Sequence, residues 1–149
     1  MGWLVLRSLF KWFKSTATKV TIQVEKGKQE KNFSCFMVEN LPDFGLAGYG
    51  NTAKQAIEDM YVAQKEIKEL LEEEGKQMPE LEFTFRFDIG SFFDYYSYLN
   101  ISGVAKKAGI NASLMRQYSM GIHEPSKKRK LQILECLQQI AKELQTAVI

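Results

Sequence analysis

Residues 101–121, ISGVAKKAGINASLMRQYSMG, place small, apolar and polar side chains where two short crossing helices need them. Ala105 precedes Gly109 by four positions, so a small side chain falls where the helices approach and a glycine falls where the turn needs positive φ. The other apolar positions would supply the buried faces: Val104, Ile110, Tyr118 and either Leu114 or Met115. The spacing therefore predicts a helix-turn-helix.

Polar residues remain on the outer side of the second predicted helix. In a helix-turn-helix this helix enters the major groove, and side chains from its N-terminal part reach the base edges. Arg can grip guanine, and Asn or Gln adenine, with paired hydrogen bonds that each provide about 1–3 kcal/mol of discrimination. The candidate base contacts are Asn111, Ser113, Arg116 and Gln117. The alternative is an ordinary helical hairpin with a polar surface.

The basic residues concentrate in the last third of the chain. Residues 101–149 carry eight Lys and Arg against three Glu, a charge of +5, whereas residues 1–100 carry twelve basic and fifteen acidic groups, a charge of −3. This division predicts two modules, of which the second binds any polyanion. The candidate phosphate contacts are Lys106, Lys107, Lys127, Lys128, Arg129 and Lys130. A solubilising surface is the alternative for the last four.

The first module shows strand patterns on both sides of one long helix. Alternating residues at 19–25 and 33–38 predict a hairpin, and 46–49 a third strand. Thr52 and Gln55 form a capping box for a helix that ends at Gly75. Its expected core positions are Ala53, Ala56, Ile57, Met60, Ile67, Leu70 and Leu71. A clear strand at 81–87 completes a β-β-β-α-β module of α+β class.

Two further helices are expected in the second module, which is predicted to be all-α. Ser91 and Asp94 fit a capping pair, and they would open the first helix of the C-terminal bundle. The last helix has a broader apolar face than one small bundle needs, which favours dimerisation through it. This face comprises Leu131, Ile133, Leu134, Leu137, Ile140, Ala141, Leu144 and Val148.

Residues 1–18, MGWLVLRSLFKWFKSTAT, predict an amphipathic extension that precedes the two modules. Basic residues interrupt the apolar run, and the segment is too short to span a bilayer. Its pattern is compatible with lying on a membrane surface. The alternatives are an oligomer contact, a strand-capping segment or an upstream start codon, and a membrane partner is not expected.

The sequence offers no recognisable arrangement for catalysis. Its single histidine, His123, lies in a loop flanked by Gly and Pro, without a triad pattern or metal-ligand spacing. Cys35 and Cys136 are far apart and form neither a metal motif nor a disulfide framework, which predicts reduced, buried thiols in a cytoplasmic protein. We therefore expect no catalytic residue, no metal site and no cofactor.

The order of these segments resembles the HicB family of type II antitoxins. The resemblance runs from Lys19 to the C-terminus through an opening strand, KVTIQVEKG, and through LPDFGLAGYGNTAKQAIEDM, which is similar to the family's loop, third strand and helix entry. It implies a partial RNase H-like domain at 19–89 that binds and blocks a small basic RNA-cleaving toxin. It also implies a helix-turn-helix domain at 90–149 that represses the shared operon.

The resemblance to an RNase H-like fold raises the question of nuclease activity. A working ribonuclease H needs several carboxylates that hold divalent metals, beginning with one in the first strand. The expected first strand has none between Val20 and Val24. The other candidates do not form an evident cluster: Asp43, Asp59, Asp88 and Asp94. The sequence thus predicts no nuclease activity.

These observations lead to one expected function and to alternatives that remain open. We expect an antitoxin-like transcriptional regulator that binds double-stranded operator DNA as a homodimer or higher homo-oligomer. Its N-terminal domain would neutralise a small basic toxin. The alternatives are an orphan transcriptional regulator and a protein-interaction module with no toxin partner.

Overall fold

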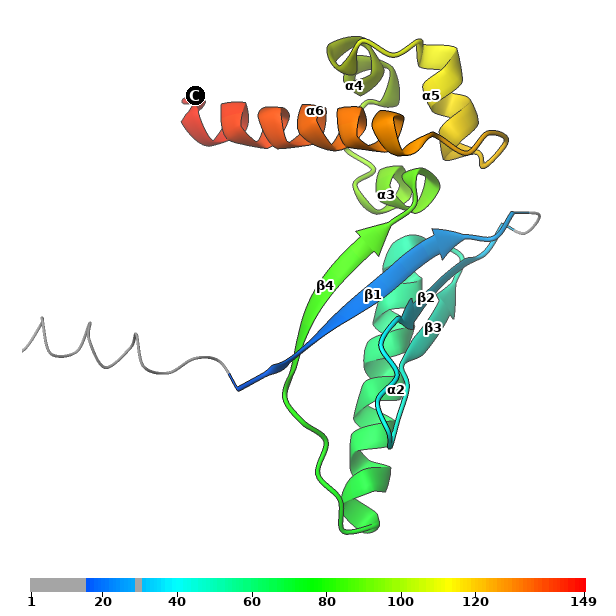
Figure 1. The fold of residues 1–149 in the computed structure, drawn as a ribbon, viewed down its shortest axis with the longest axis vertical. Coiled ribbons are helices and arrows are strands. Elements are labelled where there is room, and N and C mark those ends of the chain that lie inside the picture. The colour runs from blue at the N-terminus through cyan, green and yellow to red at the C-terminus, as the bar shows by residue number, and fades with distance from the viewer. Residues whose placement is uncertain (1–15, 29–30) are drawn as a thin grey trace, which may run out of the picture.

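The computed structural model describes residues 16–28 and 31–149 and shows a mixed α+β chain (Figure 1). Within these ranges a four-stranded sheet is combined with five helices, and the expected β-β-β-α-β order is confirmed. The elements are β1 (Thr18–Lys26), β2 (Phe33–Met37), β3 (Ala47–Gly50), α2 (Ala53–Glu73), β4 (Leu81–Phe87), α3 (Ile89–Tyr95), α4 (Ile101–Ala108), α5 (Ala112–Ser119) and α6 (Lys127–Thr146). The predicted extension 1–18 lies outside the described residues except for its last three, of which Thr18 begins β1.

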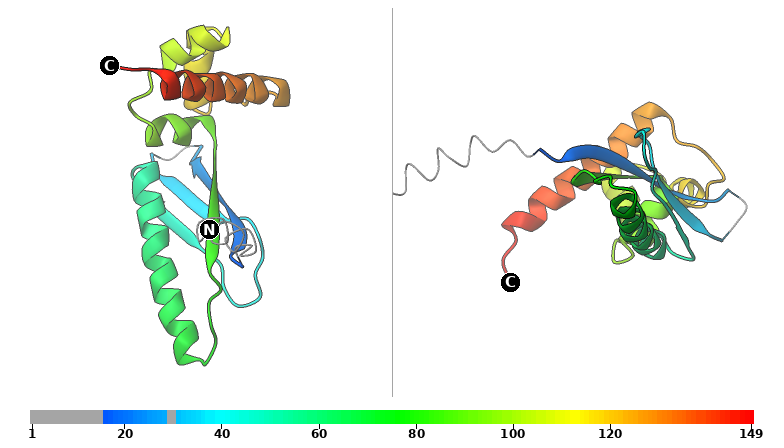
Figure 2. Two further views of the ribbon diagram at one scale, coloured as in Figure 1. Left: turned by 90° about the vertical axis from the view of Figure 1, so that its left-hand side faces the viewer. Right: turned by 90° about the horizontal axis from the view of Figure 1, so that it is seen from below.

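The sheet has the strand order β3-β2-β1-β4, and α2 covers one of its faces (Figures 1 and 2). β1 pairs antiparallel with β2 and parallel with β4, which is possible because α2 provides the crossover between β3 and β4. Register places Ile22 of β1 beside Phe85 of β4, so the apolar positions of both strands share one face. β3 begins at Ala47, one residue later than predicted; Leu46 before it is buried, and its carbonyl accepts from the Met37 amide of β2 (2.9 Å).

α2 packs very closely on the sheet at Gly48 of β3. A Cβ atom at this position would lie 2.1 Å from the carbonyl oxygen of Ala56, so only glycine fits. The Cys35 thiol of β2 donates a hydrogen bond to the same oxygen (3.2 Å). Burial, reinforced by the charge of Asp59, raises the pKa of Cys35 to about 11. Cys35 and Cys136 are both free and buried, which confirms the prediction for the thiols.

The ends of α2 follow the sequence signals closely. Thr52 Oγ1 accepts from the Gln55 amide (3.1 Å), Gln55 Oε1 accepts from the Asn51 amide (3.0 Å), and Gly75 adopts a φ of +74° after the last turn. The prediction that Leu70 lies in the core is wrong, since this side chain is 54% exposed. The C-terminal half of α2 extends beyond the strands (Figure 1), and there Leu71 rather than Leu70 occupies the buried side of the helix.

α3 connects the sheet to the remaining helices through polar contacts that involve both predicted capping residues. The prediction that Ser91 and Asp94 cap α3 is wrong. Asp88, which directly follows β4, is the N-cap, because its Oδ1 accepts from the Ser91 amide (2.7 Å). Ser91 is fully buried, and its hydroxyl donates to the Val24 carbonyl of β1 (2.8 Å). Asp94 instead accepts from the Ala53 amide at the start of α2 (2.7 Å). α3 is therefore fixed to three elements of the sheet module.

The C-terminal helices form a second apolar cluster, separate from the core between α2 and the sheet. Its buried members come from α3, α4, the turn that follows α4, α5 and α6: Phe93, Val104, Ala105, Ile110, Met115, Ile133 and Cys136. We call residues 18–87 the sheet module and residues 89–149 the helical module; the predicted domain boundary at 89/90 stays a prediction. No helix in the described ranges combines the length and apolarity needed to cross a membrane.

Candidate nucleic-acid interface

α4 and α5 meet at a turn built from the residues that the sequence singled out. Ala105 is fully buried at the helix contact, and its carbonyl accepts from the Ile110 amide (2.9 Å). Gly109 ends α4 with a φ of +72°, the left-handed conformation that favours glycine. Both local predictions are confirmed. The pair lies at the end of the molecule opposite the C-terminus of α2 (Figure 1).

α5 presents a buried and an outer side. The sequence left Leu114 and Met115 as alternatives for the core position, and the structure selects Met115, which is completely buried. Ser113 and Arg116 are exposed, while Gln117 is half-buried. The outer side of α5 thus carries hydrogen-bonding groups over its first two turns, the part that meets base edges when such a helix enters a groove.

Asn111 has a structural role in addition to its predicted one. It is the N-cap of α5, and its Oδ1 accepts from the Ser113 amide (2.9 Å) and the Leu114 amide (3.3 Å). The cap satisfies two backbone donors that a helix start otherwise leaves unpaired. The side-chain amide nitrogen stays available, so Asn111 can donate hydrogen bonds to a ligand. Its Oδ1 can accept from a ligand only if the cap is lost.

Arg116 is held by a residue that sequence reasoning missed. Its Nη2 donates to Ser102 Oγ of α4 at 2.6 Å. A guanidinium has five N–H donors, so this bond fixes the orientation of the side chain and leaves several donors for a ligand. Ser102 lies fourteen positions away, and only the packing of α4 on α5 brings the two together. A local spacing rule could not have identified it.

The six candidate phosphate contacts fall into two groups. Members of the first group have partners within the chain. Lys107 pairs with Glu143 (2.9 Å), and this contact lowers the pKa of Glu143. Lys130 pairs with Glu124, and Arg129 donates to Gln132 (3.1 Å). The other three are exposed and make no ion pair within the described parts of the chain: Lys106, Lys127 and Lys128. The second group offers cations to a polyanion without first breaking an internal bond.

The carboxylates considered for a nuclease site are used separately in the fold. Asp43 pairs with Lys76 (2.9 Å), and Asp59 accepts from the Tyr49 amide (2.9 Å). Asp88 and Asp94 accept backbone amides at the starts of α3 and α2. In residues 16–28 and 31–149, no group of three His, Cys, Asp or Glu side chains is arranged to hold a metal ion. His123 is exposed on the loop before α6.

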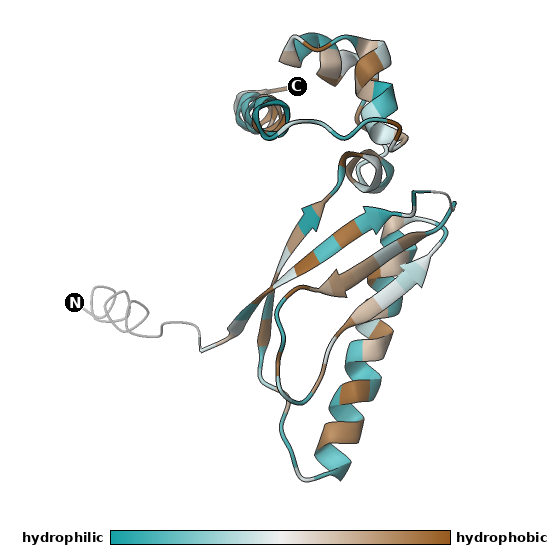
Figure 3. Ribbon diagram, turned by 45° about the vertical axis from the view of Figure 1, so that its right-hand side comes forward, coloured by the Kyte–Doolittle hydropathy of each residue, from teal (hydrophilic) through white to brown (hydrophobic). Residues whose placement is uncertain are grey.

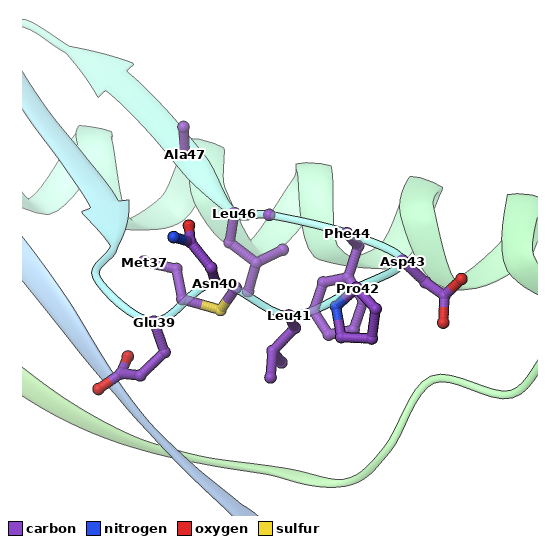
Figure 4. Close-up of a pocket in the computed structure, with 10 residues that line it drawn as sticks. Met37, Glu39, Asn40, Leu41, Pro42, Asp43, Phe44, Leu46 and Ala47 are labelled. Carbon is purple, nitrogen blue, oxygen red and sulfur yellow. The ribbon is translucent and has the colours of Figure 1, made fainter.

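A pocket of about 530 Å³ lies in the sheet module, away from α4 and α5 (Figure 4). The loop between β2 and β3 forms it, with Leu41, Pro42 and Phe44 on one side and Met37 and Leu46 at its base. Its two carboxylates already accept hydrogen bonds: Glu39 from the Thr21 amide (2.7 Å) and Asp43 from Lys76. None of the residues that line the pocket belongs to α4 or α5.

The α4–α5 pair and the surrounding cations therefore form the candidate interface. Its components are an oriented Arg116, a capped helix start at Asn111 and three lysines without an ion pair in the described chain, all within residues 101–149, which carry a charge of +5. Comparison of this chain with models of protein families, with curated proteins and with solved structures finds no match.

Proposed function

We propose that the chain is a DNA-binding transcriptional regulator in which α4 and α5 act as a helix-turn-helix. The observation that carries the proposal is the outer side of α5, where Ser113 and Arg116 are exposed on the most basic part of the chain. α5 would enter the major groove, and α4 would lie across the backbone. Phosphate contacts position such a protein on the duplex, whereas contacts to base edges give it specificity.

The roles of the side chains follow from their geometry. Arg116, oriented by Ser102, would donate a bidentate pair to guanine, and Gln117 would read adenine. Asn111 and Ser113 would contact base edges at the start of α5. Lys106, Lys127 and Lys128 would bind phosphates first, because Lys107, Arg129 and Lys130 have internal partners.

The salt dependence of DNA affinity tests this assignment. We expect wild-type protein to bind duplex DNA with an affinity that falls steeply as salt rises, and Lys127→Ala with Lys128→Ala to reduce the slope of log K against log salt by about two. A matched control, Lys65→Ala with Lys68→Ala on α2, removes two exposed lysines from the sheet module and should leave the slope unchanged. Equal losses in both variants would refute an interface on the helical module.

A second role, neutralisation of a basic protein, is favoured by the surface of the sheet module. The outer side of α2, together with its C-cap Glu74, carries seven carboxylates against three lysines, and the only ion pair between them in the described chain is Lys54 with Glu58 at 3.9 Å. On the opposite side of the module, the uncovered face of the sheet exposes Tyr49 (69%), Phe36 and Val38. The acidic surface suits a basic protein partner, such as the small RNA-cleaving toxin of an antitoxin of the HicB type, and the apolar sheet face offers a second surface for contact.

Co-expression tests this second role. If a small basic protein is encoded beside this chain, we expect the two to co-purify and the chain to restore growth that the neighbour inhibits. Tyr49→Glu should weaken the complex while leaving DNA binding intact, because Tyr49 belongs to β3 of the sheet module and α5 to the helical module. Failure both to co-purify and to restore growth would remove the antitoxin role and leave an orphan regulator.

We also infer that the chain is not a nuclease, since Asp43, Asp59, Asp88 and Asp94 each serve a different structural contact. Purified protein should not hydrolyse an RNA–DNA hybrid with Mg²⁺ or Mn²⁺. Metal-dependent hydrolysis that Asp43→Asn or Asp88→Asn abolishes would contradict this inference.

A further inference from the structure

α6 exposes large apolar side chains on the side that faces away from the other helices. Figure 3 shows α6 nearly end-on, with α3, α4 and α5 on one side of it. The exposed members form what we call the α6 stripe: Leu131 (54% exposed), Leu134 (50%) and Leu144 (65%). Leu137, which is half-buried, links the stripe to the core. Glutamines rather than charged residues lie between or beside its members, at positions 138 and 145.

The C-terminal part of α6 has little support from its own chain. Every residue from 141 to 149 is exposed, and this part of the helix projects past α4 (Figure 1). Its link to the rest of the module is the ion pair between Glu143 and Lys107. Short helical segments are marginally stable in water without a packed apolar face. A partner that covers the α6 stripe would provide that face.

We propose that a second copy of this chain covers the stripe, with the two α6 helices antiparallel. The stripe is complementary to itself in this orientation: when Gln138 lies opposite Ala141, Leu134 of each copy lies opposite Gln145 of the other, beside Leu144, and Leu131 lies near the end of the partner's helix. Each end then offers a large apolar side chain to another, and the centre has a small one. Twofold symmetry requires such a self-complementary patch.

Charge selects the antiparallel orientation over the parallel one. Parallel helices would align the two runs at Lys127–Lys130, together with the positive ends of both helix dipoles. Antiparallel helices separate the runs and place each near the C-terminal end of the partner's α6, the negative end of its dipole. The same basic run that binds phosphates in the proposed function thus also sets the direction of pairing.

This arrangement deepens the proposed function because it fixes the distance between the two DNA-reading helices. α6 has 20 residues, a length of about 30 Å at 1.5 Å per residue. α5 joins α6 at its N-terminal end through residues 120–126 (Figure 1). An antiparallel pair places the two α5 helices at opposite ends of the interface, close to the spacing of about 34 Å between half-sites on one face of a duplex.

Disulfide trapping distinguishes the two orientations. Positions 134 and 145 lie opposite each other in the antiparallel pair, whereas each is about 16 Å from its own copy. We expect Leu134→Cys mixed with Gln145→Cys to give a disulfide-linked dimer on mild oxidation, and each variant alone to give none. Wild-type protein is the control for the buried Cys35 and Cys136. A disulfide in each single variant would establish a parallel pair and overturn the proposal.

Solution mass without DNA tests the interface independently. Wild-type protein should be a dimer by light scattering, and Leu134→Glu with Leu144→Glu should be a folded monomer with unchanged circular dichroism. Leu70→Glu, on an equally exposed leucine of α2, should remain a dimer. A wild-type monomer, or a dimer that the double variant does not disrupt, would refute the α6 interface. A dimer that binds no specific DNA would refute the proposed function alone.

Discussion

The sheet module and the helical module of this chain each bury a complete core, but they expose apolar side chains on different elements. In the sheet module, α2 closes over the apolar face, and Val20, Ile22 and Val24 are at most 2% exposed. In the helical module Ala105 and Met115 are likewise fully buried, yet Leu131, Leu134 and Leu144 of α6 are exposed to solvent. A module can therefore have a complete core and still retain an apolar face, and such a face indicates an interaction outside the chain.

The two modules also differ in charge, and the difference assigns partners to surfaces. Residues 101–149 carry +5 and residues 1–100 carry −3, so a polyanion is attracted to one end of the molecule and repelled from the other. A basic protein has the reverse preference. We therefore expect DNA and a basic protein to bind at separate surfaces of the chain.

The tight packing of the sheet module should make it intolerant of one added methyl group. Gly48→Ala would place Cβ against the Ala56 carbonyl, so α2 must move off the sheet. We expect a loss of about 3 kcal/mol or more in the free energy of unfolding. Gly45→Ala is the matched control, because a Cβ there meets no atom within 4 Å. Equal urea midpoints for the two variants would show that α2 does not pack as described.

The junction between the modules depends on Asp88. Its carboxylate accepts the Ser91 amide and, through Oδ2, the Lys26 amide at 3.0 Å. Asp88→Ala leaves both donors unpaired, and we expect a cost of about 1–3 kcal/mol in thermal or chemical unfolding. Glu82→Ala removes the same charge from an exposed position of β4 and should cost less than about 0.5 kcal/mol.

Within the helical module, base reading and phosphate binding should separate on mutation. Arg116→Ala should reduce the preference for one base by about 1–3 kcal/mol and relax specificity at that position. Lys128→Ala should weaken binding to all sequences alike and lower the salt slope by about one. Competition assays with single-base variants of a bound duplex measure both. The same loss of preference in the two variants would contradict the division of roles.

The buried thiol of the sheet module should have a small effect confined to high pH. Because burial raises the pKa of Cys35 from 9.0 to about 11, folding favours the protonated thiol. The resulting stabilisation is complete below pH 9 and is lost as pH rises through about 11. Between pH 9 and pH 11 the free energy of unfolding should fall further for wild type than for Cys35→Ser, by up to about 2 kcal/mol. Parallel pH profiles would refute the shift.

Local signals in the sequence predicted the parts of the fold that depend on neighbouring residues. The α2 cap at Thr52, the turn at Gly109 and the alternation in β4 all depend on spacings within a few positions, and the structure confirms each. Asp94 was misassigned because its partner, the Ala53 amide, lies 41 positions away. Leu70 was also misassigned, because helical periodicity does not show where the sheet that covers the helix ends.

The candidate interface shows the same limit. Spacing identified the exposed residues of α5, and it also identified the wide apolar face of α6 that the structure leaves uncovered. It could not show that Ser102 orients Arg116, or which lysines have internal partners, because both depend on how α4, α5 and α6 pack. The tertiary contacts thus show which of the candidate DNA-contacting residues have partners within the chain and which do not.

Selection of bound duplexes from a randomised DNA pool at near-physiological salt would show whether α5 reads a base sequence. Wild-type protein should enrich a two-part site with half-sites about 34 Å apart, and Arg116→Ala with Gln117→Ala should not. The Lys65→Ala, Lys68→Ala variant serves as the control and should enrich the wild-type site. No enrichment by wild type, or equal enrichment by the α5 variant, would contradict DNA reading through α5.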